Sequence, residues 1–247
     1  MIRAFDYQGS ALKLFSCCRY LFIVVTVVFL QACTTTAVDD TPPDIALSKA
    51  LWKENRAILS TITDWKLKGK MAVKTGRKGG SATLKWNYLD EQQDIELYGP
   101  FGGGRVIIES DASGAVLRDT KGRVIEGETP DDVLYQRLGW QVPFNELQYW
   151  ARGIPNETAS KIKIDRLGRL KSLEQGNWMV EYQDYRKISV VSDGETLELE
   201  MPRKLLVSAL PGTMEIYTDD GEYIGDELSV KIILKRWWNI QMSPSAT

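Results

Sequence analysis

The feature that most constrains the fold of this chain is an alternation of apolar and polar residues that begins near residue 65. In the first run the apolar positions are Trp65, Leu67, Met71 and Val73, and lysines stand between them. Successive side chains of a strand point to opposite faces, so each such run predicts a strand with one apolar and one solvated face. The short connections between runs favour antiparallel pairing, because parallel neighbours need long crossovers.

Helical patterns occur at three places in the chain. The predicted helices are Ser48–Leu59, Asp131–Leu138 and Pro143–Arg152. We expect Ser48 to be the N-cap of the first helix, Thr129 and Pro130 to open the second, and Gly153 to stop the third. The last two helices interrupt the strands only once, so they form a single insert.

The remaining runs give about eleven strands in total, more than a barrel of about eight that its own side chains fill. The later runs include Trp178–Tyr182, Lys187–Val191, Thr196–Met201 and Lys204–Val207. A sheet of this size with one apolar face must curl or split, and the helical insert is the natural lid over its opening. The pattern is equally satisfied if Trp86, Trp150 and Trp178 fill a solid core, because alternation identifies the apolar face but not whether that face is hollow.

A secretion signal precedes the alternating region. The residues Leu30-Gln31-Ala32-Cys33 end an apolar run that starts at Leu21, and basic residues stand before it. A run of about ten residues is too short to span a bilayer, so the pattern predicts a cleaved lipoprotein signal peptide. Diacylglycerol would be transferred to the Cys33 thiol, and the new amino terminus would be acylated, which leaves three acyl chains. The alternative is an ordinary signal peptide with a chance cysteine.

This signal divides the chain into three predicted parts. They are the signal peptide at residues 1–32, a lipidated tether at residues 33–46 and a folded domain at residues 47–247. The tether is rich in Thr, Asp and Pro, which is typical of a linker.

Composition excludes several classes of function. Histidine is absent, Cys17 and Cys18 leave with the signal peptide, and Cys33 is consumed by lipid. The mature chain therefore lacks the usual general base, the commonest metal ligand and any free thiol, and we expect no catalytic residue, no metal site and no cofactor. Removing residues 1–32 takes three of the 31 basic and one of the 33 acidic residues, which leaves a net charge of −4. A chain of this charge offers no basic field for nucleic acid.

Carboxylates are the one remaining route to catalysis, since a pair of them suffices for glycoside hydrolysis. Most acidic residues here alternate with apolar ones, which places them on solvated strand faces. An enzyme that acts on envelope glycans is therefore a disfavoured alternative, and we expect a protein that is not an enzyme.

A glycine-rich loop, Tyr98–Arg105, lies between two predicted strands and contains Phe101. A phosphate-binding glycine loop leads into a helix, whereas a strand follows here, so nucleotide binding is not expected. The neighbours of Phe101 are Pro and Gly, which have no side chains large enough to bury its ring. Unless the ring folds back on the domain, it contacts either water or an apolar phase outside the domain. Burying a Phe is worth about 2 kcal/mol, enough to orient a protein that is already tethered.

Taken in order, these motifs resemble one family, the outer-membrane lipoprotein receptor LolB. The segments that carry the resemblance are Trp52, the strand that ends in Trp86, Leu97–Gly102, Leu147–Pro155 and Trp178–Tyr182. The resemblance implies a mainly β fold with a helical lid: an incomplete, unclosed antiparallel β-barrel of about eleven strands that encloses an apolar cavity. After Met201 the chain is longer and more acidic than the family pattern.

The resemblance also implies a function, which is to accept lipoproteins from the periplasmic carrier LolA and insert them into the outer membrane. Cys33, which the signal pattern predicts to be lipidated, is the expected lipid anchor. By resemblance, Phe101 occupies a loop position where the family often has Leu. The expected membrane-insertion loop is Gly99, Pro100, Phe101 and Gly102, and the expected acyl-binding cavity is lined by Trp86, Leu97, Trp150 and Trp178.

Such a protein would be a monomer that is lipid-anchored in the outer membrane and faces the periplasm. Its partners would be lipoproteins, LolA and membrane lipid, with no cofactor and no nucleic acid. A lipid-binding or envelope-sensing lipoprotein on the same fold is the open alternative.

Overall fold

The computed structural model describes residues 44–243, apart from 77, 100–103, 140–141, 157–158, 193, 218–222 and 226. These residues belong to one unit that begins at Pro43. The predicted signal peptide and Cys33 lie outside the described residues. No helix among the described residues is both long enough and apolar enough to cross a membrane.

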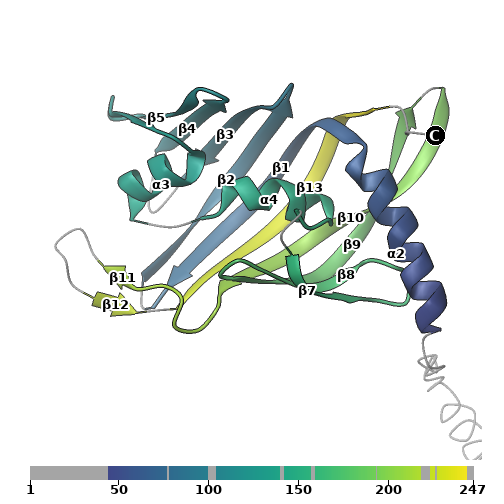
Figure 1. Ribbon diagram of the computed structural model, residues 1–247. Helices are drawn as coiled ribbons and strands as arrows, with labels where there is room; N and C mark the ends of the chain where they lie inside the picture. Colours follow the sequence, from purple (N-terminus) through teal and green to yellow (C-terminus); the bar gives the residue numbers. More distant parts are fainter. Residues whose placement is uncertain are drawn as a thin grey trace, which may run out of the picture. The chain divides into compact units, whose positions relative to one another are not determined.

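Most of the described chain forms one antiparallel sheet of eleven strands in the order β6-β5-β4-β3-β2-β1-β13-β10-β9-β8-β7 (Figure 1). The strands of its first half are β1 Ile62–Thr75, β2 Lys78–Leu89, β3 Gln92–Tyr98, β4 Arg105–Asp111, β5 Gly114–Asp119 and β6 Val124–Gly127. Those of its second half are β7 Ala159–Ile164, β8 Leu170–Gln175, β9 Trp178–Ser192, β10 Glu195–Ala209 and β13 Leu228–Met242. A separate two-stranded sheet pairs β11 Ile216–Tyr217 with β12 Tyr223–Gly225.

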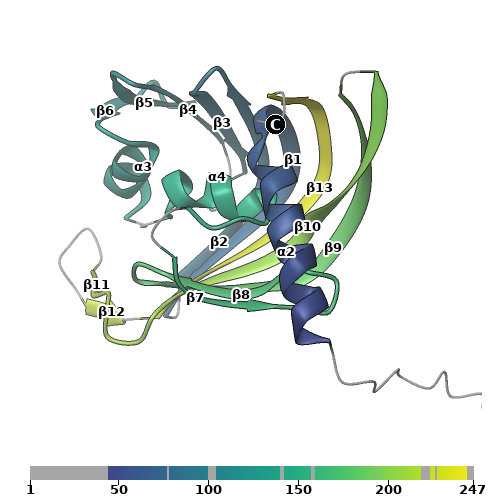
Figure 2. The same cartoon turned by 45° about the vertical axis from the view of Figure 1, so that its right-hand side comes forward.

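Three helices accompany the sheet: α2 Ile45–Ser60, α3 Pro130–Leu138 and α4 Phe144–Arg152. β13 pairs with β1 on one side and with β10 on the other, so it joins the two halves of the sheet. This leaves β6 and β7 as the two edges, and the chain passes between them through α3 and α4. Figure 2 shows the sheet curving around these two helices, which we call the lid. The predicted fold, an unclosed antiparallel sheet with a helical lid, is confirmed.

The alternating pattern corresponds to the two faces of the curved sheet. Along β1 the residues Trp65, Leu67, Met71 and Val73 are buried, while Lys68, Lys70 and Lys74 are exposed. The apolar positions of β2 repeat this pattern, so the inward face of the sheet is the one that the sequence predicts. Burial of each large apolar side chain contributes roughly 2 kcal/mol, which makes this face the main source of stability.

The ends of the lid helices follow the sequence signals. Thr129 and Asp132 form a capping box at the start of α3, and Gly153 adopts the left-handed conformation that stops α4. The predicted N-cap of α2 is wrong. Asp44 is the N-cap, because its carboxylate accepts hydrogen bonds from the first free N–H groups of the helix, and Ser48 is buried within the first turns.

Two predicted strand breaks are also wrong. Trp178–Tyr182 and Lys187–Val191 are parts of one strand, β9, and Thr196–Met201 and Lys204–Val207 are parts of its neighbour β10. The register between the two strands shifts near Pro202, between Pro202 and Lys204. A bulge tolerates proline because the ladder is already interrupted there, so the strand continues through it.

A partly buried carboxylate joins the two lid helices. The side chain of Asp131, in the first turn of α3, accepts a hydrogen bond of 2.7 Å from the backbone N–H of Phe144 at the start of α4. Burial raises the pKa of Asp131 to about 7, and the nearby charges of Glu146 and Asp132 act in the same direction. The two helices are therefore connected by a group whose charge changes near neutral pH.

We expect Asp131→Asn to remove a pH dependence of stability. Between the pKa of an unfolded carboxyl, about 4, and the folded value of about 7, the folded protein binds more protons, so the free energy of unfolding of the wild type should fall as the pH rises. Asn can still accept the Phe144 hydrogen bond but has no charge to bury. Its free energy of unfolding should exceed that of the wild type by about 1–2 kcal/mol at pH 8.

Chemical denaturation of both proteins between pH 4 and pH 8 provides the measurement. Glu126→Gln, which changes an exposed carboxylate on β6, is the matched control and should follow the wild type. A decline of equal size in the wild type and in Asp131→Asn would contradict the assignment.

Candidate functional site

An aromatic cluster lies on the inward face of three adjacent strands. Trp65 on β1 has its ring centroid 5.0 Å from that of Trp86 on β2 and 5.3 Å from that of Trp237 on β13, both in edge-to-face geometry. From the lid, the ring of Phe144 packs edge-to-face on Trp86 at 5.3 Å. The first side chain of α4 therefore packs on the central strands of the sheet.

Polar contacts also attach the lid to the second half of the sheet. Trp150 on α4 donates its indole N–H to the buried side-chain oxygen of Gln175 on β8, at 3.1 Å. The hydroxyl of Tyr182 on β9 donates to the backbone carbonyl of Trp150 at 3.2 Å, and burial raises the pKa of this tyrosine. Both partners of Trp150 are buried, so the helix has one defined position on the sheet.

Arg152 attaches the C-terminal end of the lid to the start of β1. Its side chain is 7% exposed and donates from Nη1 to the carbonyl oxygen of Ile62 at 2.7 Å and from Nε to the carbonyl of Gln148. The guanidinium also lies 5.2 Å from the ring centroid of Tyr149. Burial lowers the pKa of Arg152, and its hydrogen bonds go to carbonyl groups. A buried cation held in this way costs more than one paired with a carboxylate.

The four predicted cavity residues come from different elements but lie together. Trp86 on β2, Leu97 on β3, Trp150 on α4 and Trp178 on β9 are all buried and belong to one core cluster. Phe144 of α4 belongs to the same cluster and packs on Trp86. Their role as an acyl-binding cavity stays a prediction.

Sequence reasoning missed several residues of this site. Trp65 and Trp237 lie in the same ring cluster as Trp86, and Phe144 is the lid residue that covers it. The alternation already placed Trp65 and Trp86 on inward faces of consecutive strands, which was a usable signal. Trp237 gave no such signal, because the pairing of β13 with β1 is a long-range contact.

The predicted insertion loop joins β3 to β4. Pro100, Phe101 and Gly102 lie outside the described residues, whereas Gly99 lies inside them. The backbone N–H of Gly99 donates to the carbonyl of Gly104 at 2.8 Å, and the backbone of Gly99 has φ +68°, a value that favours glycine. The base of this loop is therefore closed by a backbone hydrogen bond.

A charged cluster stands beside the base of the loop. Glu96 on β3 accepts hydrogen bonds from Arg105 on β4, at 2.6 Å from Nη2, and from the hydroxyl of Tyr98. Burial opposes the ionisation of Glu96, but the hydrogen bonds from Tyr98 and Arg105 outweigh it and lower its pKa. Lys85 on β2 donates to the Tyr98 hydroxyl as well. These contacts link β2, β3 and β4 at the point where the loop leaves the sheet.

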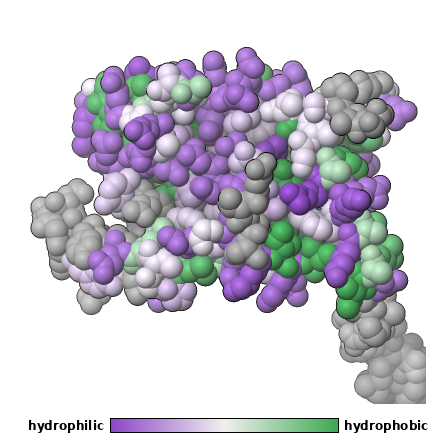
Figure 3. Space-filling view, viewed as in Figure 1, coloured by the Kyte–Doolittle hydropathy of each residue, from purple (hydrophilic) through white to green (hydrophobic). Residues whose placement is uncertain are grey.

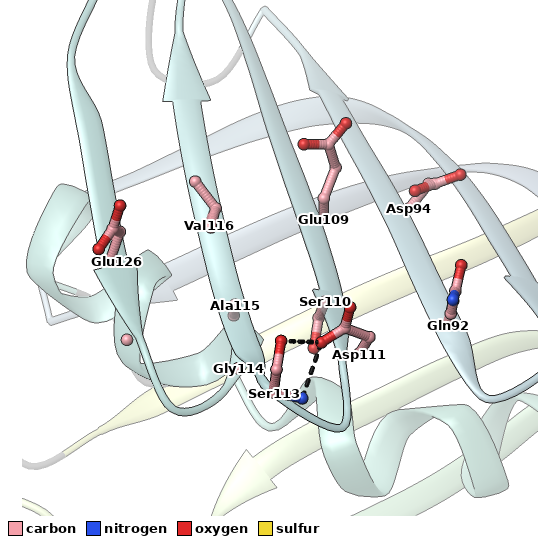
Figure 4. A pocket seen from close by; sticks show the side chains of 11 residues that line it. Gln92, Asp94, Glu109, Ser110, Asp111, Ser113, Gly114, Ala115, Val116 and Glu126 are labelled. Atoms are coloured by element: carbon pink, nitrogen blue, oxygen red, sulfur yellow. Dashed lines mark hydrogen bonds between the residues drawn. The ribbon is translucent and has the colours of Figure 1, made fainter.

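Three pockets lie elsewhere on the domain. A polar hollow of about 490 Å³ lies at the β4–β5 hairpin, where Figure 4 shows Asp94, Glu109, Asp111 and Glu126 around it. Smaller pockets of about 310 and 60 Å³ lie beside the β1–β2 turn and beneath α2. None of the three is lined by the predicted cavity residues. In the described part of the chain, no three His, Cys, Asp or Glu side chains could hold a metal ion together.

Apolar surface gathers along α2 and the strands beside it. Figure 3 shows hydrophobic side chains in this region and a mostly hydrophilic surface over α3 and β3–β5. Ile45 and Leu47, in the first turn of α2, are 66% and 55% exposed. The other end of α2 is held on the domain, because Asn55 donates to the carbonyls of Leu167 and Gly168.

Comparison with known proteins shows which family this arrangement belongs to. The family model described as outer membrane lipoprotein LolB matches residues 63–237. The outer-membrane lipoprotein LolB of Chromohalobacter salexigens is 31% identical over 186 residues, which cover 75% of this chain and 81% of the relative. The protein of the same name from Pseudomonas putida strain F1 is 36% identical over 135 residues, which cover 54% of this chain and 66% of the relative.

A solved structure of a LolA superfamily protein from Nitrosomonas europaea covers 77% of this chain and 92% of its own, at 9% identity and a TM-score of 0.40. At this identity and TM-score the structural match carries no argument, so the family assignment rests on the sequence comparisons. The family match covers most of the described strands and both lid helices, and it confirms the resemblance inferred from the motifs. The chain therefore belongs to the LolB family of outer-membrane lipoproteins.

Proposed function

We propose that this protein is an outer-membrane lipoprotein receptor that accepts lipoproteins from LolA and inserts them into the outer membrane. The observation that carries the proposal is the lid of an unclosed sheet, whose apolar side chains occupy the concave face. Acyl chains offer the same kind of apolar surface. A lid that fills the interior when the site is free, and moves aside when acyl chains enter, keeps the apolar face covered in both states.

The energetics of acyl chains explain why a receptor of this kind is needed. Moving a sixteen-carbon chain into water costs about 0.8 kcal/mol per methylene, which is on the order of 12 kcal/mol per chain and more than roughly 30 kcal/mol for three. A triacylated protein therefore does not cross an aqueous compartment alone. Transfer from one apolar interior to another avoids this cost, and no covalent step is needed. We therefore propose a transport role and no enzymatic one.

The lid contacts indicate how the site opens. Asp131 connects the start of α4 to α3, so the two helices move together. Opening breaks the hydrogen bond between Trp150 and Gln175 and the one between Arg152 and Ile62. Each hydrogen bond has a net value of about 1 kcal/mol, so acyl chains that replace the apolar contacts of α4 can compensate for their loss.

We expect a brominated fatty acid to quench the tryptophan fluorescence of this protein in a saturable manner. Trp86, Trp150 and Trp178 would meet the acyl chain, whereas Trp238 is half-buried next to Arg236 and belongs to the outward pattern of β13. Trp86→Phe should therefore reduce the quenched amplitude, and Trp238→Phe should leave it unchanged. If no saturable quenching occurs, the interior is a solid core and the receptor proposal fails.

We expect Cys33 to be the only lipidated residue, because Cys17 and Cys18 precede the cleavage site. Mass spectrometry of the mature amino terminus should find a triacylated Cys33 as the first residue. An unmodified Cys33, or a terminus upstream of it, would contradict the proposed anchor. In Cys33→Ala the domain should fold normally and lose its stable attachment to the membrane.

Delivery should depend on the loop between β3 and β4. We expect Phe101→Glu to leave folding and acceptance of lipoproteins from LolA nearly unchanged, and to slow delivery to liposomes at least roughly tenfold. The physical reason is that a carboxylate placed in hydrocarbon costs a few kcal/mol. The variant should accumulate loaded with lipoprotein, which a pull-down with labelled cargo measures.

The matched control is Val191→Glu, which puts the same charge on an apolar side chain that is 70% exposed on β9. It should deliver at the wild-type rate. A sharp loss of thermal stability in Phe101→Glu would mean that the ring is packed on the domain, and delivery at the wild-type rate would mean that the loop is not the insertion device.

A further inference from the structure

Three tryptophans under the lid have buried indole N–H groups without an acceptor. Among the described residues, nothing accepts a hydrogen bond from Nε1 of Trp65, Trp86 or Trp237, and the three side chains are 1%, 0% and 9% exposed. Trp150 differs, because its N–H donates to Gln175. Buried tryptophans usually have a partner for this donor, and an unpaired donor in an apolar interior is costly.

The three donors form one cluster rather than three separate cases. Trp86 on β2 and Trp237 on β13 both stand opposite Leu67 of β1, on either side of it. The ring of Trp65 packs against both, with centroid distances of 5.0 Å to Trp86 and 5.3 Å to Trp237. Phe144 of the lid packs on Trp86, so moving α4 away uncovers the ring of Trp86.

An indole fills more of an apolar interior than a phenyl ring does, but it also brings a polar hydrogen. The three indoles in this cluster therefore present donors that the closed state does not use. A ligand that fits such a site has a large apolar body and carries hydrogen-bond acceptors that enter the interior with it.

We propose that the indole N–H groups of Trp65, Trp86 and Trp237 bind the ester and amide carbonyl oxygens of the acyl groups of the cargo, an inference that rests on the proposed function. A lipoprotein that has a diacylglycerol on its cysteine and an acyl group on its amino terminus carries two ester carbonyls and one amide carbonyl. Each carbonyl loses its water when it enters an apolar site, and each indole lacks an acceptor until it does. Pairing them removes both penalties at once.

The position of the cluster is consistent with this role. Trp65 lies near the start of β1 and Trp86 near the end of β2, at the end of the sheet where Arg152 holds the lid to Ile62. Carbonyls stand at the head of each acyl chain, so donors near one end of the sheet leave the rest of its concave face for the hydrocarbon. The site would therefore distinguish an acylated glycerol from a hydrocarbon of the same length.

The test compares two probes that differ in their carbonyls: 1,2-dipalmitoylglycerol, which has two ester carbonyls, and 1,2-dihexadecylglycerol, the diether that has none. Full-length protein in amphipol is titrated with each. Because one hydrogen bond changes affinity about two- to tenfold, the ester should bind several-fold more tightly than the ether. The infrared band of a ¹³C-labelled ester carbonyl should move to lower frequency in the bound state, as it does when a carbonyl accepts a hydrogen bond.

Variants separate hydrogen bonding from packing. Trp86→Phe and Trp237→Phe should each lower the ratio of ester to ether affinity about two- to tenfold, whatever they do to the two affinities themselves. Trp238→Phe is the control and should leave the ratio unchanged. If a phenylalanine variant fails to fold, the same tryptophan is substituted by benzothienylalanine instead. This residue keeps the shape of the indole ring and lacks the N–H.

The outcomes distinguish this inference from the function it rests on. If both probes bind equally and the carbonyl band stays at its position in alkane, the inference is overturned while the acyl-binding function stands. A ratio that Trp86→Phe and Trp237→Phe leave unchanged also overturns it. If neither probe binds, the receptor function and the inference fail together.

Discussion

The structure depends on a sheet that has an apolar concave face and does not close on itself. β13 pairs with β1 along most of its length and with β10 over Ser229–Ile233, which leaves β6 and β7 as the two edges of the sheet. A closed barrel of this size would cover its own interior, but an open one must be covered by something else. The chain supplies α3 and α4 as that cover, and it does so in the connection between the two edges.

A cover made of helices differs from a cover made of strands in one respect that matters for function. Helices satisfy their own backbone hydrogen bonds, so α4 can leave the sheet without exposing unpaired backbone groups. What it loses is side-chain packing and a few polar contacts at its ends, which involve Asp131, Trp150 and Arg152. Two of these contacts bury a group that is ionised in water, so they fix the position of the lid without adding much stability. These polar contacts make the closed state specific, whereas its stability comes from the packing of buried side chains such as Phe144, Leu147 and Trp150.

Much of this fold could be predicted from the sequence, because its signals are local. Alternation identified the inward residues of β1 and β2, and Thr129 and Gly153 identified the ends of the lid helices. The errors have local causes too. Ser48 is a residue type that often caps helices, but α2 already begins at Ile45 and Asp44 caps it. Pro202 is a residue type that usually interrupts strands, but here a bulge accommodates it. What sequence could not provide was the pairing of β13 with β1, which depends on contacts between residues far apart in the chain.

The same limit explains why the ring cluster escaped the sequence analysis. Trp65 and Trp86 lie on neighbouring strands, but Trp237 joins them only through the long-range pairing, and the lack of an indole acceptor appears only when all three rings are in place. In an analysis of apolar and polar alternation, tryptophan counts only as a large apolar residue, so the alternation carries no information about its N–H. In the function that we propose, acyl chains replace the lid side chains in the interior. Both offer a similar apolar surface, so this surface alone would not favour cargo over lid. The indole N–H groups that the lid leaves unpaired would supply the difference in free energy, because in our proposal the carbonyl oxygens of the cargo accept their hydrogen bonds.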